Sequence, residues 1–141
     1  MTKSNGYHDP VLLQSCLEGL VLKPGGVYVD VTFGGGGHSK AILEAESDLD
    51  LVAFDQDPDA KQNIPEDSRL TFVPANFRHL KRFLRLEGFV PVDGILADLG
   101  VSSYQIDTAE RGFSTRFDGP LDMRMDKSAS LSASDLSLIH I

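Results

Sequence analysis

The sequence of 141 residues holds one cysteine, no uninterrupted apolar run of about 18 residues and no apolar block at its start. A lone Cys16 can form neither an internal disulfide nor a thiolate metal cage, so we expect a small core residue in a protein of a reducing compartment. The missing apolar run excludes a membrane-spanning helix, and the first residues lack the pattern of a signal peptide. We therefore expect a cytoplasmic protein without a membrane partner, long enough for one compact core.

Charge is unevenly distributed along the chain. The formal net charge is −8, which taken alone disfavours nucleic acid as a partner. Nine acidic residues and only one basic residue, Lys61, lie between residues 44 and 67, so this stretch carries −8 and the rest sums to zero. Between residues 76 and 88 the balance reverses, with four basic residues against Glu87. The basic segment is compatible with contact to phosphates, although we favour a solvated helix face.

Apolar runs alternate with helical patterns along the first hundred residues. Short β-branched or apolar runs predict strands at 27–31, 51–54, 70–73 and 94–97. Helices are predicted at 10–20, 39–46 and 77–86, together with a short helix that Asp57-Pro58-Asp59 opens and Pro65 ends. Strands separated by helices of this size imply right-handed βαβ units and a parallel sheet. The predicted fold class is α/β, doubly wound.

Four consecutive glycines, Gly34 to Gly37, lie where the first predicted strand turns into a helix. Glycine allows a tight turn and a close approach of a ligand, and a helix start offers unpaired N–H groups. No Gly-Lys-Ser/Thr follows, and Ser39 occupies the third glycine position of the dinucleotide fingerprint. Kinase-type phosphate loops and nicotinamide cofactors are therefore disfavoured. A glycine-rich turn alone is a weak signal, because a merely tight turn has the same composition.

Two carboxylates strengthen this signal. Asp55 follows the second predicted strand, 21 residues after Gly34, where doubly wound folds keep an acid that binds ribose hydroxyls, and Asp98 follows the fourth strand. The carboxyl ends of parallel strands meet at one edge of a sheet, so the turn and both acids are predicted to face one crevice. Each acid alone is more often a helix cap or a turn former. Together they favour a nucleoside cofactor without phosphates. S-adenosylmethionine is such a cofactor, because its sulfonium cation and its adenosine are bound by carboxylates and an apolar wall.

Five motifs occur in the order found in one enzyme family. They are Tyr7-His8-Asp9-Pro10-Val11-Leu12-Leu13, the stretch from Tyr28-Val29-Asp30 through Thr32-Phe33-Gly34 to Gly36-Gly37-His38-Ser39, Asp98-Leu99-Gly100-Val101-Ser102-Ser103, Arg111-Gly112-Phe113-Ser114, and Pro120-Leu121-Asp122-Met123-Arg124-Met125-Asp126. The set resembles the signatures of the RsmH (MraW) family, S-adenosylmethionine-dependent methyltransferases that act on the exocyclic amine N(4) of a cytidine in small-subunit (16S) ribosomal RNA near the decoding centre. The resemblance covers nearly everything from Tyr7 to Asp126.

The resemblance implies a Rossmann-like class I methyltransferase fold, S-adenosylmethionine as cofactor, and 16S ribosomal RNA in the small ribosomal subunit as partner. Carried over by position, the cofactor contacts fall on Gly36, Gly37, His38, Asp55, Phe77, Asp98 and Gln105. Asp98 is also the candidate catalytic residue, orienting either the cofactor or the attacking amine. Phe77 serves either as a wall for the adenine or, as we favour, as a core residue. His38 acts through its backbone N–H more than its ring, and no metal site is expected.

Members of this family are about twice as long as this chain. We therefore expect a fragment whose sheet is truncated after about four strands and which is inactive alone. Residues 1–101 are then the N-terminal half of the cofactor-binding domain, 102–127 a structureless active-site or substrate loop, and 128–141 the start of an inserted helical domain. The loop arginines, Arg111, Arg116 and Arg124, contact RNA phosphates or pair with Glu110, Asp118, Asp122 or Asp126. The alternative function is a non-catalytic cofactor-binding or ribosome-docking fragment; a homodimer is one option for the oligomeric state.

Overall fold

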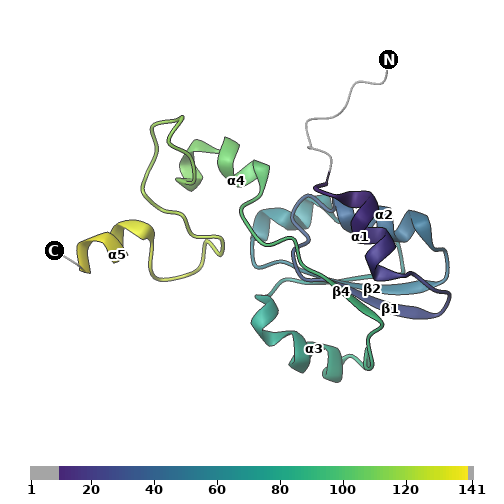
Figure 1. Ribbon diagram of the computed structural model, residues 1–141. Helices are drawn as coiled ribbons and strands as arrows, with labels where there is room; N and C mark the ends of the chain where they lie inside the picture. The colour runs from purple at the N-terminus through teal and green to yellow at the C-terminus, as the bar shows by residue number, and fades with distance from the viewer. Residues whose placement is uncertain (1–9, 140–141) are drawn as a thin grey trace, which may run out of the picture. The chain divides into compact units, whose positions relative to one another are not determined.

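The computed structural model describes residues 10–139 of the chain. Within this part the chain forms two compact units, residues 10–99 and residues 100–139. The first unit holds a parallel sheet and the second holds short helices joined by turns (Figure 1). None of the helices in residues 10–139 has the length and apolar character that crossing a membrane requires.

Four parallel strands form the sheet of the first unit. They are β1 (Gly26–Asp30), β2 (Leu49–Phe54), β3 (Leu70–Val73) and β4 (Gly94–Leu96), in the spatial order β3-β2-β1-β4. Val29 lies opposite Val52 on one side and Ile95 on the other. The chain adds β2 and β3 in one direction and then returns to place β4 on the far side of β1, so the strand order reverses between β1 and β4. The order confirms the predicted doubly wound, Rossmann-like α/β fold.

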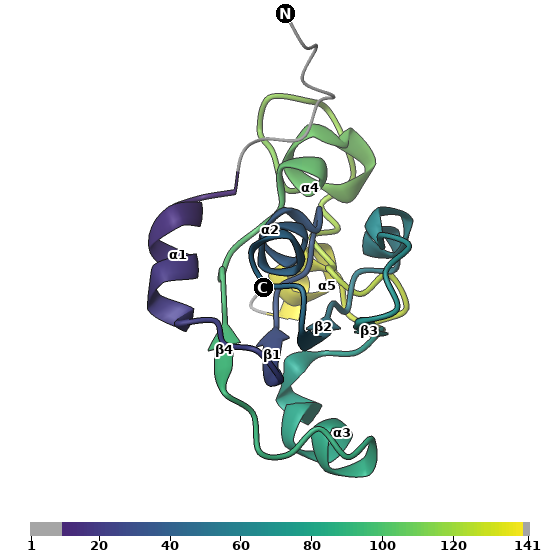
Figure 2. The ribbon, with the colours of Figure 1, turned by 90° about the vertical axis from the view of Figure 1, so that its right-hand side faces the viewer.

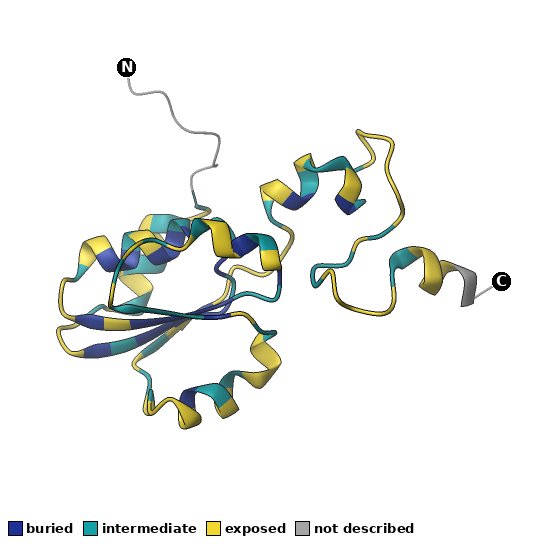
Figure 3. Cartoon of the chain, turned by 180° about the vertical axis from the view of Figure 1, so that it is seen from behind, coloured by how far each residue is buried: buried dark blue, intermediate teal, exposed yellow. Residues whose placement is uncertain are grey.

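Helices cover both faces of this sheet. Successive side chains of each strand point to opposite faces, so both faces carry apolar side chains that must be buried. On one face, Tyr28 and Leu51 pack with Ile42 beneath α1 (Leu13–Leu20) and α2 (Gly37–Ala45). On the other, Val29 and Val52 pack with residues of α3 (Leu80–Leu86). Figure 2 shows the strands in their spatial order with α2 and α3 on opposite sides. The buried residues are concentrated in the strands and in the sheet-facing sides of the helices (Figure 3).

Most predicted elements of the first unit are found within two residues of their expected ends, and two need correction. The first helix begins at Leu13 instead of Pro10, since Leu12 takes the left-handed conformation with φ of 52° and no side chain caps the helix. Asp9, whose side chain before Pro10 predicts a cap for this helix, lies outside the described residues. The helix predicted from Phe77 begins as the 3₁₀ turn η2 (Phe77–His79), capped by Asn76. Cys16, predicted in the core, is only partly buried at its margin.

The predicted absence of structure between residues 102 and 126 is wrong. This part of the chain forms α4 (Ser103–Asp107) and the 3₁₀ turn η3 (Ala109–Arg111), and α5 (Ala133–Ile139) follows. A capping box starts α4: the Ser102 hydroxyl accepts from the Gln105 N–H at 3.2 Å, and Gln105 Oε1 accepts from the Ser102 N–H at 3.0 Å. The Ser-x-x-Gln spacing of this box is visible in the sequence.

Arginines hold the second unit together. Arg124 pairs with Asp122 at 2.6 Å, which confirms internal pairing for that residue. Arg116 pairs instead with Asp107 at 3.1 Å, a carboxylate outside the predicted set. Arg111 is buried, and its guanidinium donates to the carbonyl oxygens of Arg124 at 2.9 Å and Met125 at 3.1 Å. The three loop arginines therefore stabilise their own unit.

The short 3₁₀ segment η1 (Pro58–Asn63) connects β2 to β3. Asp57 caps it by accepting from the Asp59 N–H at 3.0 Å, and Pro58 supplies its first residue, as predicted from Asp57-Pro58-Asp59. The segment places Asn63 beside the glycine-rich turn, where its side chain contributes to the candidate site described next.

Candidate functional site

The carboxylate of Asp30 fixes the end of β1 to the start of α2. Asp30 is 1% exposed; its Oδ1 accepts from the Thr32 N–H at 3.0 Å and its Oδ2 from the Ser39 hydroxyl at 2.7 Å. Burial raises the pKa of Asp30, and the two donors act against this by favouring the charged form. The sequence motifs contain Asp30 but assign it no role. A carboxylate that ends an otherwise apolar strand is the signal that could have identified it.

The glycine-rich turn is bonded directly to Asp55. Gly34 has φ of 50°, in the left-handed region that favours glycine, and its N–H donates to Asp55 Oδ2 at 2.7 Å. Its carbonyl accepts from the Asn63 side-chain amide at 3.0 Å. A methyl group added to the Cα of Gly34 would meet only the Thr32 carbonyl oxygen, at 3.9 Å. The turn is therefore held rigidly while space remains beside its backbone.

Asp55 keeps the capacity to bind a ligand. It is half-buried, and its second oxygen, Oδ1, accepts from the Asp57 N–H at 2.8 Å. Burial raises the pKa of Asp55, opposed by the backbone N–H groups that bond to the charged form. These bonds fix the direction of the carboxylate without using all of its about four acceptor positions. Asp55 can thus accept hydrogen bonds from further donors such as hydroxyl groups.

Asp98 meets the same turn through its backbone. Its N–H donates to Thr32 Oγ1 at 2.7 Å, and its side chain is exposed. Because Asp98 follows β4 and Thr32 follows β1, this bond joins the two strands between which the strand order reverses. The structure therefore brings Asp55 and Asp98 to one short turn, at Gly34 and Thr32 respectively. Sequence reasoning did not identify Thr32 or Asn63 as the residues that make these connections.

The ring of His38 supports the start of α2. His38 is 8% exposed, and its Nε2 lies 3.0 Å from the carbonyl oxygen of Val11. The preceding residue, Gly37, leaves no room for a side chain because Pro10 packs against it. Gly36 caps the helix with φ of 76°. The segment around Pro10 and Val11 thus lies against the first turn of α2, with the His38 ring as its anchor.

Phe77 and Gln105 lie in different surroundings. Phe77 is 43% exposed, so the interpretation of it as a core residue is wrong. The cap of its 3₁₀ turn, Asn76, donates to Gln56 Oε1 at 2.7 Å, which links the chain after β3 to the residue following Asp55. Gln105 is 4% exposed and belongs to the second unit, where it closes the capping box of α4.

Within residues 10–139 no three His, Cys, Asp or Glu side chains are grouped to hold a metal ion.

A model of the MraW methylase family matches residues 5–138, nearly the whole sequence. The chain belongs to the MraW methylase family. The resemblance of its five motifs to that family is thereby confirmed.

Proteins with the name Ribosomal RNA small subunit methyltransferase H are similar to this MraW family chain. The one from Phocaeicola vulgatus is 59% identical over 131 residues, which are 92% of this chain and 43% of that protein. The one from Christiangramia forsetii is 61% identical over 128 residues, 90% of this chain and 42% of that protein. The chain thus spans less than half the length of these relatives. Among solved structures, a methyltransferase from an antibiotic biosynthesis pathway of Anabaena variabilis matches half of the chain and 28% of its own, at 20% identity and a TM-score of 0.42.

Proposed function

We propose that this chain is the cofactor-binding part of an S-adenosylmethionine-dependent methyltransferase that acts on 16S ribosomal RNA of the small subunit. The reaction is transfer of a methyl group to the exocyclic amine N(4) of a cytidine near the decoding centre. Membership of the MraW methylase family supports a methyltransferase, and the names of the relatives support small-subunit ribosomal RNA as substrate. The observation that carries the proposal is the 2.7 Å hydrogen bond from the Gly34 N–H to Asp55 Oδ2. It joins the glycine-rich turn to a carboxylate that can accept hydrogen bonds from ribose hydroxyls.

The residues around the turn fit a nucleoside cofactor. Asp55 has acceptor capacity for the ribose hydroxyls, and the exposed ring of Phe77 offers a flat apolar wall to the adenine. The backbone of Gly36, Gly37 and His38 lines the start of α2. The N–H of Gly36 donates to the Phe33 carbonyl oxygen at 2.7 Å, whereas those of Gly37 and His38 lie in the first turn, without helical acceptors, and are available to the amino-acid end of the cofactor. Gln105 stays a prediction from the family resemblance. When bound, S-adenosylmethionine supplies an electrophilic methyl group on its sulfonium.

The chain's own contribution to the reaction is positioning. Methyl transfer is an in-line displacement that needs little acid or base catalysis, so holding the amine and the methyl group in line provides most of the rate. The exposed carboxylate of Asp98 is the candidate catalytic group, as a hydrogen-bond acceptor for the cytosine amine or for the cofactor. Its backbone N–H donates to Thr32 Oγ1 at 2.7 Å, which holds Asp98 beside the turn.

The experiment uses a chimera, because the chain spans only 43% of its Phocaeicola vulgatus relative. This chain replaces the matching region of that relative, and methyl transfer from labelled S-adenosylmethionine to unmethylated small ribosomal subunits is measured, with N(4)-methylcytidine identified in the digested RNA. We expect methylation by the chimera and a loss of about 10- to 150-fold in the Asp98→Asn variant, since a hydrogen bond to a charged group contributes about 1.5–3 kcal/mol. Asp50→Asn, an exposed acid on β2, is the matched control.

Calorimetry on the same proteins separates the two roles of Asp98. An unchanged cofactor affinity in Asp98→Asn assigns the carboxylate to the amine, and a parallel loss of affinity assigns it to the cofactor. A folded chimera that binds the cofactor and yields no N(4)-methylcytidine contradicts the proposed substrate. Full methylation by the Asp98→Asn chimera contradicts the catalytic role of Asp98.

A further inference from the structure

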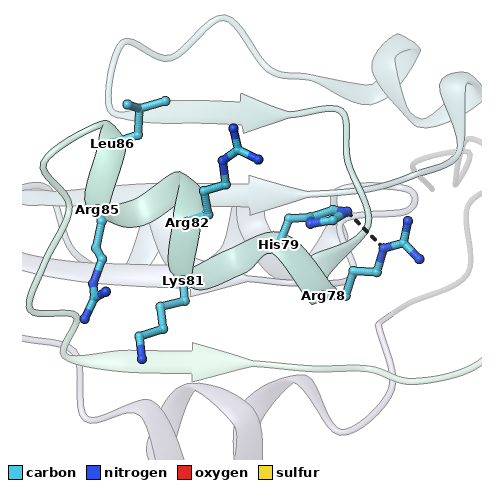
Figure 4. A pocket seen from close by; sticks show the side chains of 6 residues that line it. All are labelled: Arg78, His79, Lys81, Arg82, Arg85 and Leu86. Atoms are coloured by element: carbon cyan, nitrogen blue, oxygen red, sulfur yellow. Dashed lines mark hydrogen bonds between the residues drawn. The ribbon is translucent and has the colours of Figure 1, made fainter.

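A basic surface lies on the outer side of η2 and α3, opposite the side of the helix that packs against the sheet. Figure 4 shows its side chains projecting from these two elements around an open pocket; they are Arg78, His79, Lys81, Arg82, Arg85 and Leu86. All six are exposed. The opposite side of α3 is apolar, and Leu80, Phe83 and Leu84 pack there against the sheet. We refer to the four cations Arg78, Lys81, Arg82 and Arg85 as the α3 basic face.

The cations of the α3 basic face form no ion pair within residues 10–139. The one polar contact of their side chains there is a hydrogen bond from Arg78 Nε to His79 Nε2, at 2.9 Å. Every other arginine of the chain is engaged by the fold: Arg69 by Asp67 and two carbonyls, Arg111 by two carbonyls, Arg116 by Asp107 and Arg124 by Asp122. The fold thus places all its unpaired arginines on one surface, although acidic residues outnumber basic ones by 21 to 13.

The spacing of these cations makes them repel one another. Lys81 and Arg85 are four residues apart within α3, so they lie one turn apart on the same side, and Arg78 precedes the helix in the 3₁₀ turn η2. Like charges at this spacing destabilise a helix, and no carboxylate of the described residues forms an ion pair with these cations. A bound polyanion would offset it, because its negative groups can interleave with the row of cations.

We propose that the α3 basic face binds the phosphate backbone of the RNA that this protein methylates. The choice of RNA rests on the proposed function. The face begins at Arg78, next to Phe77 and five residues after β3 ends, and continues to Arg85, about 10 Å along the helix axis at 1.5 Å per residue. Because η2 follows the carboxyl end of β3, the face begins at the edge of the sheet at which Asp55 and Asp98 lie. An anionic membrane is the less suitable partner, because only Leu86 on this surface is a large apolar side chain.

The test measures binding of the purified chain to a labelled RNA hairpin with the small-subunit decoding-centre sequence, as a function of salt. The variant carries Arg82→Gln and Arg85→Gln. Each lost phosphate contact lowers the slope of log affinity against log salt by about 0.7 for single-stranded and about 0.9 for duplex nucleic acid. Two contacts therefore correspond to a slope lower by about 1.4 to 1.8. Over a fourfold rise in salt the wild type should then lose about 7- to 12-fold more affinity than the variant.

Two further double variants distinguish the loss of charge on the α3 basic face from a change in the fold and from a change in the net charge of the chain. Arg82→Lys with Arg85→Lys keeps the charges and should keep the salt slope. Lys40→Gln with Lys61→Gln removes two exposed, unpaired cations elsewhere and should leave the slope within about 0.3 of the wild type, because long-range charge alone contributes little in salt. If Arg82→Gln with Arg85→Gln weakens RNA binding no more than this lysine control, the α3 basic face is not the binding surface and the proposal is overturned. The proposed function is unaffected by that result.

The remaining outcomes distinguish the two proposals. No salt-dependent RNA binding by the wild type overturns the proposal, whereas methylation by the chimera and cofactor calorimetry test the proposed function independently. Vesicles of phosphatidylglycerol serve as a second probe. Loss of vesicle binding with unchanged RNA binding in the glutamine variant overturns the proposal in favour of a membrane surface.

Discussion

Replacing Asp55 by asparagine tests the candidate cofactor site most directly. The carboxylate accepts from two backbone N–H groups, one on each oxygen, those of Gly34 at 2.7 Å and Asp57 at 2.8 Å. Asparagine has one acceptor oxygen, so one of these bonds is lost and an NH₂ group faces an N–H donor in its place. A hydrogen bond to a charged group contributes about 1.5–3 kcal/mol, so we expect the free energy of unfolding to fall by roughly that amount.

The affinity for S-adenosylmethionine should fall as well. A ribose hydroxyl that donates to the Asp55 carboxylate contributes a bond of the same kind, and about 1.5–3 kcal/mol corresponds to a roughly 10- to 150-fold higher Kd. Calorimetry measures the Kd, and urea denaturation followed by circular dichroism measures the stability of the same samples. Asp50→Asn removes one exposed carboxylate from the same strand and should change neither quantity.

The two measurements together can refute the reasoning. A variant that is less stable but binds the cofactor with the wild-type Kd identifies Asp55 as a structural acid of the turn with no ligand contact. A variant with wild-type stability indicates that the bond to the Gly34 N–H is not made in solution, and the rigid turn inferred from it is then wrong.

Two further predictions concern the residues that hold the turn. Thr32→Val removes the acceptor of the Asp98 N–H and should lower the free energy of unfolding by about 1 kcal/mol in urea, whereas Thr32→Ser, which keeps the hydroxyl, should not; equal stability of both variants contradicts the bond. Burial raises the folded-state pKa of Asp30 above 3.8, so its contribution to stability is fully present below pH 3.8 and is lost as pH rises through the raised pKa. Asp30→Asn should remove this loss, and parallel pH profiles of wild type and variant in thermal denaturation would show that the raised pKa is wrong.

Local patterns in the sequence determined most of the first unit. The strands are short apolar runs, and the helices between them follow from spacing within about ten residues, so a parallel α/β arrangement could be predicted. The same holds for the turn at Gly34 and for Asp55, because both follow strands that can be recognised from their own residues. The prediction failed at α4, where the Ser102 and Gln105 capping box outweighed the lack of apolar periodicity.

Tertiary structure alone decided which distant residues meet. The return of the chain to pair β4 with β1 joins Asp98 to Thr32, 66 residues apart, and folding of α2 onto the sheet buries Asp30 against Ser39. The composition of residues 78–85 predicted a basic helix face. Only the contacts of the folded chain, within residues 10–139, show that the arginines of this face form no ion pair, whereas every other arginine bonds to a carboxylate or a carbonyl oxygen. Such pairings depend on the crossovers between strands, which no local pattern of residues encodes. The sequence by itself therefore determined the elements and their class, and the packing of those elements determined the site.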